Sequence, residues 1–211
     1  ELLYDTVVEV AERLDAAGRV LTALELSRAR ADMEAAHAAG VRSIAIALLH
    51  AYLNPIHEQQ LAQLAAELGF SQVSTSHEVS GLAKLVGRGD TTVVDAYLSP
   101  ILRRYVDQVA GALNIGGNCK ALMFMQSNGG LTDARKFQGK DAILSGPAGG
   151  IVGMVQTGQQ AGFDKLIGFD MGGTSTDVSH FAGKFERSFE TEVAGVRMRA
   201  PMMDIHTVAA G

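Results

Sequence analysis

Several common features are scarce or absent in this sequence, and each absence excludes something. The chain has one cysteine, Cys119, so no disulfide bond can form within it, and a reducing compartment such as the cytoplasm fits best. We interpret Cys119 as a core or near-surface thiol and not as a nucleophile. No run of roughly 18 apolar residues occurs, so no membrane partner is expected, and no charged start before an apolar segment marks a signal peptide.

Basic residues are outnumbered as well. The chain has 18 Lys and Arg residues against 23 Asp and Glu residues, which gives a net charge of −5. A nucleic-acid binder typically shows a basic excess gathered in a stripe, so we expect no nucleic-acid partner. What the chain does have is apolar side chains. They make up 47% of its 211 residues, which is enough to build a core and argues against disorder.

The length allows one large domain or two small ones, at about 100–200 residues per domain. Short apolar runs alternate with amphipathic segments, which predicts an α/β fold. We expect a smaller N-terminal unit at residues 1–85 and a second unit at residues 86–211. The chain begins at Glu1 instead of Met and ends in an apolar run, so we expect it to be a fragment of a larger enzyme.

Turn-forming residues set the expected boundaries of the elements. Gly40 and Gly69 end helices, and Asn54 with Pro55 begins one. A long helix is expected at residues 90–113, and Pro100 should distort it or split it in two. The other expected helices cover residues 21–39, 54–68 and 145–161. The expected strands cover residues 41–49, 70–74, 121–125, 165–170, 177–181, 184–191 and 196–199.

The most informative stretch is residues 170–177, Asp-Met-Gly-Gly-Thr-Ser-Thr-Asp, which follows an apolar strand. Phosphate oxygens need close approach by backbone N–H groups, and successive N–H groups in a turn form a concave anion site. Gly172 and Gly173 permit this approach because glycine has no Cβ and tolerates positive φ. Three hydroxyl residues follow and can add hydrogen-bond donors: Thr174, Ser175 and Thr176.

Two carboxylates, Asp170 and Asp177, bound this stretch and cannot favour an anion directly. They make sense as ligands of Mg²⁺, usually through water, because Mg²⁺ keeps part of its hydration shell. A P-loop and a dinucleotide fingerprint both need a glycine-rich turn before a helix, and neither pattern is present here. The residues after Thr176 alternate like a strand. We therefore predict a hairpin that binds ATP phosphates, and the alternative is a hairpin turn without a ligand.

Other residues offer weaker signals, and none can be named as catalytic. Ser127, Asn128 and Gly129 follow a strand and could line a substrate cleft, or form only a tight turn, for which Asn-Gly is a strong signal. The glycines of residues 146–150 are expected to let a helix pack closely on the hairpin. We interpret residues 88–90 as a loop and helix cap.

Histidines near a carboxylate could indicate a metal site. The set consists of His50, His57, Glu58 and His77. The pair at positions 50 and 57 spans a turn that contains Pro55, which does not place both rings on one helical face. We therefore favour capping and packing over metal binding for these residues.

These motifs carry a resemblance to a known family. Residues 170–177 are similar to the phosphate hairpin of the actin-like ATPases, which include sugar kinases, the seventy-kilodalton chaperones and actin. Residues 145–150, placed before a helix and that hairpin, resemble the hydantoinase A/5-oxoprolinase family more narrowly. The similarity covers nearly all residues after Ala11 in the family's order. The other matching stretches are residues 49–58, 76–79, 92–98 and 125–131.

Within that family, residues 88–100 and 168–187 look closest to the 5-oxoprolinase branch. Residues 85–88 depart from the Glu-Tyr-Glu-Arg pattern of the hydantoinase branch. Residues 126–130 read Gln-Ser-Asn-Gly-Gly where eukaryotic 5-oxoprolinases read Arg-Ser-Asp-Gly-Gly, which leaves the role of Asn128 open.

The resemblance implies an actin-like (ribonuclease H-like) ATPase fold, in which a mixed sheet is flanked by helices and two lobes close over ATP and Mg²⁺. It also implies a second Asp-x-Gly-Gly-Thr loop before residue 1 and nucleotide-binding segments after residue 211. The 211 residues alone are therefore expected to be inactive. Their partners are expected to be the rest of the polypeptide or a complementary subunit, and a homo-oligomer stays open.

The activity implied for the intact enzyme is the ATP-dependent opening of 5-oxo-L-proline, a cyclic amide, to L-glutamate. An unstrained lactam is a poor electrophile, and phosphorylation of its oxygen would let water attack it; most of the catalysis of the phosphoryl step lies in positioning and charge stabilisation. Alternatives within the family are an N-methylhydantoinase and an ATP-dependent ketone carboxylase subunit. An alternative of another class is a non-catalytic actin-like nucleotide-binding module.

Overall fold

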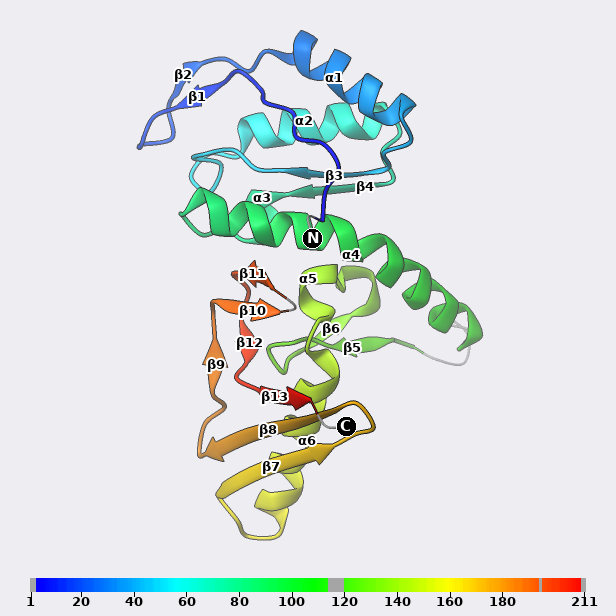
Figure 1. Ribbon diagram of the computed structural model, residues 1–211, viewed down its shortest axis with the longest axis vertical. Coiled ribbons are helices and arrows are strands. Elements are labelled where there is room, and N and C mark those ends of the chain that lie inside the picture. Colours follow the sequence, from blue (N-terminus) through cyan, green and yellow to red (C-terminus); the bar gives the residue numbers. More distant parts are fainter. Residues whose placement is uncertain (1–2, 114–119, 194, 210–211) are drawn as a thin grey trace. The chain divides into compact units, whose positions relative to one another are not determined.

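The computed structural model describes residues 3–113, 120–193 and 195–209. The chain divides into two compact units, which are considered separately (Figure 1). Unit 1 comprises residues 1–104 and 192–199, and unit 2 comprises residues 105–191 and 200–211. Cys119 lies outside the described residues, so our interpretation of its thiol stays a prediction.

Unit 1 is built around a parallel pair of short strands with helices packed beside it. Its elements, in chain order, are β1 (Arg13–Leu14), β2 (Val20–Thr22), α1 (Leu26–Ala38), β3 (Ser43–Ile46), α2 (Ile56–Glu67), β4 (Gln72–Thr75), α3 (Ser76–Val79), most of α4 (Leu85–Ala112), β10 (Thr191–Val193) and β11 (Val196–Met198). In Figure 1, β3 and β4 lie between α2 and α4.

The core of unit 1 forms where α1 and α2 bury their apolar faces against β3. Strands β3 and β4 pair in parallel, with Ser43 opposite Gln72 and Ile46 opposite Thr75. Parallel strands need a crossover connection, and α2 supplies it. The buried core residues are Ala29, Met33, Ile46, Leu61, Leu64, Ala65 and Phe70. The expected strands near residues 41–49 and 70–74 are therefore confirmed, although both are shorter than expected.

Two expectations about helices in unit 1 are wrong. Residues 20–22 form β2, an antiparallel partner of β1, so α1 starts only at Leu26. Helix α4 starts at Leu85 and continues without a break through Pro100. Residues ahead of Asp90 belong to it because Arg88 is fully buried and its tertiary hydrogen bonds fix this turn, which outweighs the local pattern. Residues 88–90 are thus helical and form no loop.

The division between the units also differs from the expected boundary after residue 85. The compact units divide within α4, between Arg104 and Tyr105, because the first part of that helix packs into unit 1. Ser74 of β4, for example, donates a hydrogen bond of 2.7 Å to the carboxylate of Asp95 on α4. A boundary placed by turn residues misses this, since a helix can begin in one unit and end in the next.

Unit 2 consists mainly of antiparallel strands and one glycine-rich helix. Its remaining elements, in chain order, are β5 (Met123–Met125), β6 (Leu131–Asp133), η1 (Ala134–Lys136), α5 (Gly139–Ala142), α6 (Ser145–Gln160), β7 (Lys165–Met171), β8 (Ser175–Ala182), β9 (Arg187–Ser188), β12 (Met202–Met203) and β13 (His206–Ala209). Residues 184–191 were expected to be one strand, but only two of them form β9, which pairs with β12.

A three-stranded antiparallel sheet, in the order β13-β8-β7, is the centre of unit 2. Helix α6 covers one face of it and contributes Ala148, Ile151 and Val155 to a core shared with Phe181 and Met203. The expected helix at residues 145–161 and the expected hairpin at 165–181 are confirmed. The single mixed sheet is not seen in the described residues, which instead form several small sheets of two or three strands.

Side chains of β7 alternate between the two faces of this sheet. Leu166 and Gly168 face α6, and so does the next residue in that series, Asp170. The opposite face carries apolar side chains that are well exposed in this chain: Ile167 (76%), Phe169 (66%) and Met171 (66%). Among the described helices, none has both the length and the apolar character needed to cross a membrane.

Close packing of α6 on the sheet depends on different glycines from those expected. A Cβ at Gly146 or Gly150 would meet nothing within 4 Å, so the expectation that residues 146–150 allow close packing is wrong. A Cβ at Gly158 would lie 2.6 Å from Leu166 Cδ1, and one at Gly168 would lie 2.7 Å from Met154 Sδ. The close approach therefore occurs at the C-terminal half of α6.

The contact between Gly168 and Met154 predicts different effects on stability for two alanine substitutions. Gly168→Ala should lower the free energy of unfolding by about 1–3 kcal/mol because its methyl group would overlap Met154. Gly153→Ala is the matched control on α6, since a Cβ there meets nothing within 4 Å, and it should be neutral or stabilise by about 0.5–1 kcal/mol. Urea denaturation of the 211-residue chain measures both, and equal effects would contradict the packing described.

Candidate functional site

The stretch predicted to bind phosphate is a strand–turn–strand hairpin. Strands β7 and β8 pair antiparallel with Asp170 opposite Asp177 and Met171 opposite Thr176. The turn between them is closed by a hydrogen bond of 2.8 Å in which the N–H of Gly172 donates to the carbonyl oxygen of Ser175. The hairpin geometry is thus confirmed, and the loop at its end consists of residues 172–174.

The backbone of this turn differs from the expected conformation. Neither Gly172 nor Gly173 has a positive φ, so glycine is not required here for its conformational freedom. A Cβ at Gly173 would meet nothing within 4 Å, which leaves open space in front of the backbone. The Gly172 N–H is used within the turn. For the N–H groups of Gly173 and Thr174, no hydrogen bond is found among the described residues. These two groups are the donors available to an anion.

The alternation of β8 divides the predicted phosphate-binding residues between two faces. Ser175 and Asp177 lie on the face that Asp170 shares with α6. Thr176 lies on the other face, is 3% exposed, and sits opposite Met171 and Val208. Thr176 is therefore separated from the carboxylates, and a hydroxyl contact from it to the same ligand does not fit this geometry.

Asp170 and Asp177 form a like-charged pair directly across the hairpin. Opposed like charges destabilise a sheet unless something neutralises them. Asp177 accepts a hydrogen bond of 2.7 Å from the hydroxyl of Thr207 on β13. For the carboxylate of Asp170, the described residues supply no hydrogen bond and no ion pair. A bound cation would satisfy this arrangement.

The two carboxylates of Asp170 and Asp177 suit Mg²⁺ better than a metal ion whose ligands all come from the protein. No group of three or more His, Cys, Asp or Glu side chains with metal-binding geometry occurs in the described part of the chain. Two carboxylates are enough for Mg²⁺, which binds proteins through one or two carboxylates and completes its shell with water and phosphate oxygens. Asp170 and Asp177 would be the residues that hold it.

Helix α6 makes its close contacts with this face of the sheet through its C-terminal half. The two chains run in opposite directions, since Gly158 meets Leu166 and Met154 meets Gly168. Gly146 and Gly150 are exposed and lie about half a helical turn from Ala148, which packs against the sheet. The open space at these glycines is therefore not part of the hairpin site.

The substrate-cleft hypothesis for Ser127 does not fit the structure. Ser127 is 1% exposed, and its hydroxyl donates to the carbonyl of Asp141 at 2.7 Å and accepts from the N–H of Leu144 at 3.1 Å. Asn128 accepts from the N–H of Gly130 at 2.7 Å, and Gly129 has φ +82°. These residues form the tight turn that was the alternative interpretation. The hydrogen bonds of Ser127 connect this turn to the backbone of Asp141 and Leu144 within unit 2.

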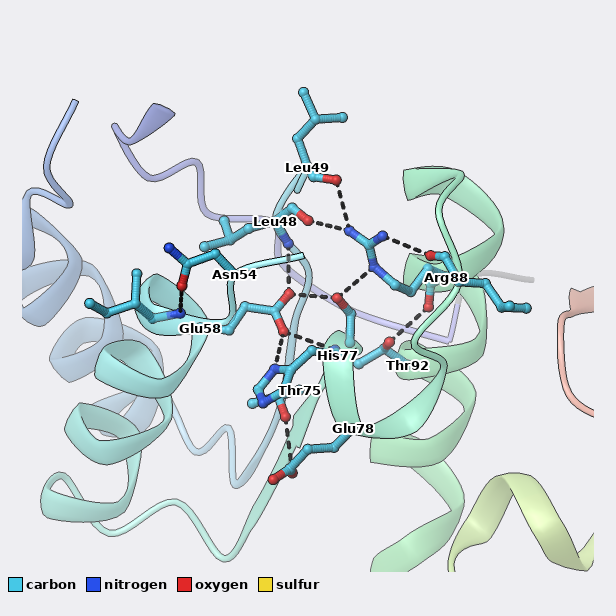
Figure 2. Close-up of polar contacts among 12 residues, drawn as sticks. Leu48, Leu49, Asn54, Glu58, Thr75, His77, Glu78, Arg88 and Thr92 are labelled. Atoms are coloured by element: carbon cyan, nitrogen blue, oxygen red, sulfur yellow. Dashed lines mark hydrogen bonds and ion pairs between the residues drawn. The ribbon is translucent and has the colours of Figure 1, made fainter. Parts of the chain in front are cut away.

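A buried polar cluster in unit 1 contains two of the four residues weighed as a metal site, Glu58 and His77. Figure 2 shows Glu58 at its centre. Glu58 is fully buried and its carboxylate accepts hydrogen bonds from the N–H of Leu48 (2.9 Å), the hydroxyl of Ser76 (2.5 Å), and the N–H of His77 (3.0 Å). The ring Nδ1 of His77 lies 2.7 Å from the same carboxylate.

Arg88 extends this cluster and is itself fully buried. Its Nε donates to the hydroxyl of Ser76 at 2.8 Å, and its Nη atoms donate to backbone carbonyls. Those carbonyls belong to Leu48, Leu49, Leu82 and Ala83. The guanidinium also lies over the ring of Tyr52, 5.5 Å from its centre. Burial lowers the pKa of Arg88 from its ordinary value, and the charge of Glu58 opposes that shift.

The protein's own donors therefore occupy the carboxylate that a metal would need. His57 is engaged elsewhere, with its Nδ1 2.7 Å from the carboxylate of Glu12. These contacts show His57, Glu58 and His77 in packing and hydrogen-bonding roles. The cluster as a whole was missed from the sequence. One signal was available, because Glu58 occurs on the same helical face as the apolar residues Leu61 and Ala65.

Comparisons with known proteins agree with the motifs described above. The family model for the hydantoinase/oxoprolinase N-terminal region matches residues 1–69, and the hydantoinase/oxoprolinase model matches residues 88–211. The 5-oxoprolinase of Saccharomyces cerevisiae is 41% identical over 99% of this chain, which spans 18% of that protein's length.

Two solved structures are similar to this fold over 96% of the chain. Nucleotide-free acetone carboxylase matches with a TM-score of 0.86 and 26% identity, and this chain covers 29% of it. The ATP-dependent caprolactamase of Pseudomonas jessenii matches with a TM-score of 0.84 and 30% identity, and this chain covers 30% of it. The chain therefore spans less than a third of each protein it matches here.

The cluster shown in Figure 2 predicts that replacing Arg88 with lysine destabilises the fold. Arg88→Lys keeps the charge but loses the planar fork that reaches several carbonyls at once. It should lower the free energy of unfolding by about 3 kcal/mol. Arg104→Lys, an exposed arginine on the same helix, should change it by less than about 0.5 kcal/mol. Urea denaturation of the 211-residue chain would contradict the role of Arg88 if both variants matched the wild type.

Proposed function

This chain belongs to the hydantoinase/oxoprolinase family, and we propose that the full-length protein opens 5-oxo-L-proline to L-glutamate with hydrolysis of ATP. The observation that carries the proposal is the 41% identity to a 5-oxoprolinase over 99% of the chain. The hairpin supports it, because Asp170 and Asp177 face each other beside backbone N–H groups for which the described part of the chain supplies no acceptor. An enzyme that phosphorylates an amide oxygen needs such a place for phosphate and its cation.

Five residues of the hairpin have a proposed task. The N–H groups of Gly173 and Thr174 and the hydroxyl of Ser175 donate hydrogen bonds to phosphate oxygens. Asp170 and Asp177 hold Mg²⁺, mostly through water. Bound there, Mg²⁺ neutralises charge on the phosphates, and ATP supplies the phosphoryl group that activates the lactam. The protein's part is to fix these groups in place before reaction.

The wider setting of the site is part of the same proposal. The hairpin followed by β13 is consistent with the first strands of an actin-like ATPase lobe, and the rest of the nucleotide site comes from the longer polypeptide or from a second subunit. The full-length protein acts in the cytoplasm, in line with the single cysteine of these 211 residues. The small-molecule substrate is a cyclic amide.

Substrate-dependent ADP release by the full-length protein tests the function. The assay compares 5-oxo-L-proline, N-methylhydantoin and acetone with bicarbonate, each with ATP and Mg²⁺. The proposal predicts that 5-oxo-L-proline stimulates ADP release and yields glutamate. Stimulation by N-methylhydantoin or acetone alone would reassign the protein within its family. ATP turnover that ignores all three would instead favour a nucleotide-binding module without a small-molecule substrate.

The proposed metal role predicts the effect of neutralising Asp170. Asp170→Asn in the full-length protein should lower kcat by about 10²-fold or more, because a carboxylate that holds Mg²⁺ stabilises the charge of the transition state. Asp164→Asn, at an exposed position just before β7, is the matched control and should retain activity. Activity of Asp170→Asn within a few-fold of wild type, at an unchanged Mg²⁺ requirement, would rule out this role.

The open turn predicts that Gly173→Val separates binding from stability. The backbone there has no positive φ and a Cβ meets nothing within 4 Å, so the thermal midpoint should stay nearly unchanged. ATP affinity of the full-length protein should be lost, because the side chain fills the space that phosphate needs.

Gly183→Val is the control for that experiment. Gly183 has φ +83° in the loop after β8, so valine there should lower the thermal midpoint and keep ATP affinity. Calorimetry and equilibrium nucleotide binding measure the two properties in the same samples. Normal ATP affinity in Gly173→Val would show that the hairpin is a turn without a ligand.

A further inference from the structure

Three residues form a row across the central sheet of unit 2. Asp170 on β7 is opposite Asp177 on β8, and Asp177 is in turn opposite Thr207 on β13. Side chains at directly opposed positions of neighbouring strands point to the same face. All three therefore lie on the face that α6 covers, where the chain leaves Asp170 without a partner among the described residues.

Thr207 contacts Asp177 through its side chain. The Thr207 hydroxyl donates a hydrogen bond of 2.7 Å to Oδ1 of Asp177. A carboxylate has two oxygens, and this bond engages Oδ1 while no hydrogen bond to Oδ2 is found in the part of the chain described. A β-branched side chain is stiff about χ1, so the donor is held in one place by its own backbone. The bond thus fixes how Asp177 is turned.

We infer that Thr207 is a positioning residue, which orients the Asp177 carboxylate so that its second oxygen faces the cation shared with Asp170. The inference rests on the proposed function in one respect, that a magnesium–nucleotide complex binds at this hairpin. Nothing in it depends on which cyclic amide the enzyme uses. Partners that orient a metal-binding carboxylate tune the affinity of the metal site.

A purely structural role for Thr207 fits the environment less well. Its side chain is exposed, and it lies outside the core shared by α6 and the sheet. β13 is joined to β8 along four paired positions, so the strand does not depend on one side-chain contact. The bond also lacks the burial that makes the cluster around Glu58 and Arg88 important for stability.

The test uses Thr207→Val and Thr207→Ser in the full-length protein. Valine keeps the shape and the β-branch but has no hydroxyl, whereas serine keeps the hydroxyl. The direct readout is binding of Mn²⁺, measured by electron paramagnetic resonance in the presence of the non-hydrolysable analogue AMP-PNP. Thr207→Val should weaken Mn²⁺ binding roughly 10-fold, Thr207→Ser should restore most of it, and the thermal midpoints of both should match the wild type.

A double-mutant cycle shows whether the effect passes through Asp177. If Thr207 acts by orienting that carboxylate, Thr207→Val should have no further effect on Mn²⁺ binding once Asp177→Asn is present. Equal additional loss in that background would overturn the inference. So would Mn²⁺ binding unchanged by valine, or a lowered thermal midpoint with normal Mn²⁺ affinity, which is the behaviour of a structural contact.

The outcome can be separated from that of the proposed function. If the wild-type protein binds Mn²⁺ with nucleotide and the valine variant weakens it, but 5-oxo-L-proline does not stimulate ADP release, the positioning role of Thr207 stands and only the substrate assignment fails. If 5-oxo-L-proline is a substrate and Thr207→Val binds Mn²⁺ as tightly as the wild type, the function stands and the inference about Thr207 is overturned.

Discussion

The pairing register of β7 and β8 is the constraint on which the candidate site depends. It sets Asp170 directly opposite Asp177, and a shift of one residue would turn one of them to the other face of the sheet. The register is fixed by the same alternation that packs Leu166 and Phe181 against α6. Burial of an apolar face therefore holds two like charges together, which is costly without a cation and favourable with one.

Unit 1 is held together by a different kind of interaction. The fully buried Glu58 and Arg88 do not bond each other directly but share the hydroxyl of Ser76, which donates to the carboxylate and accepts from the guanidinium. Removing either charge would take away the opposite charge that compensates the other group in this buried cluster. Because the protein's own groups satisfy Glu58 and Arg88, this cluster joins α2, α3 and α4, and we place the chemistry at the hairpin of unit 2.

Much of the local structure could be predicted from the sequence, since hairpin, helix and turn signals lie close together along the chain. The hairpin at residues 170–177 and the start of α6 followed from such signals. The start of α4 and the end of unit 1 did not, because distant contacts decide them, as between Ser74 and Asp95. The same holds for Thr207, whose partner is 30 positions away in sequence. Glycine content alone also did not indicate the packing sites, because Gly146 and Gly150 have open space around them and the close contacts occur at Gly158 and Gly168.

The central claim is that the β7–β8 hairpin holds a magnesium–nucleotide complex. A crystal structure of the full-length protein with AMP-PNP and Mg²⁺ tests it most directly. The account predicts phosphate oxygens within hydrogen-bond distance of the N–H groups of Gly173 and Thr174, and a metal ion on the face shared by Asp170 and Asp177. Nucleotide bound with its phosphates and metal away from this hairpin, while Asp170 and Asp177 face only solvent, would contradict it.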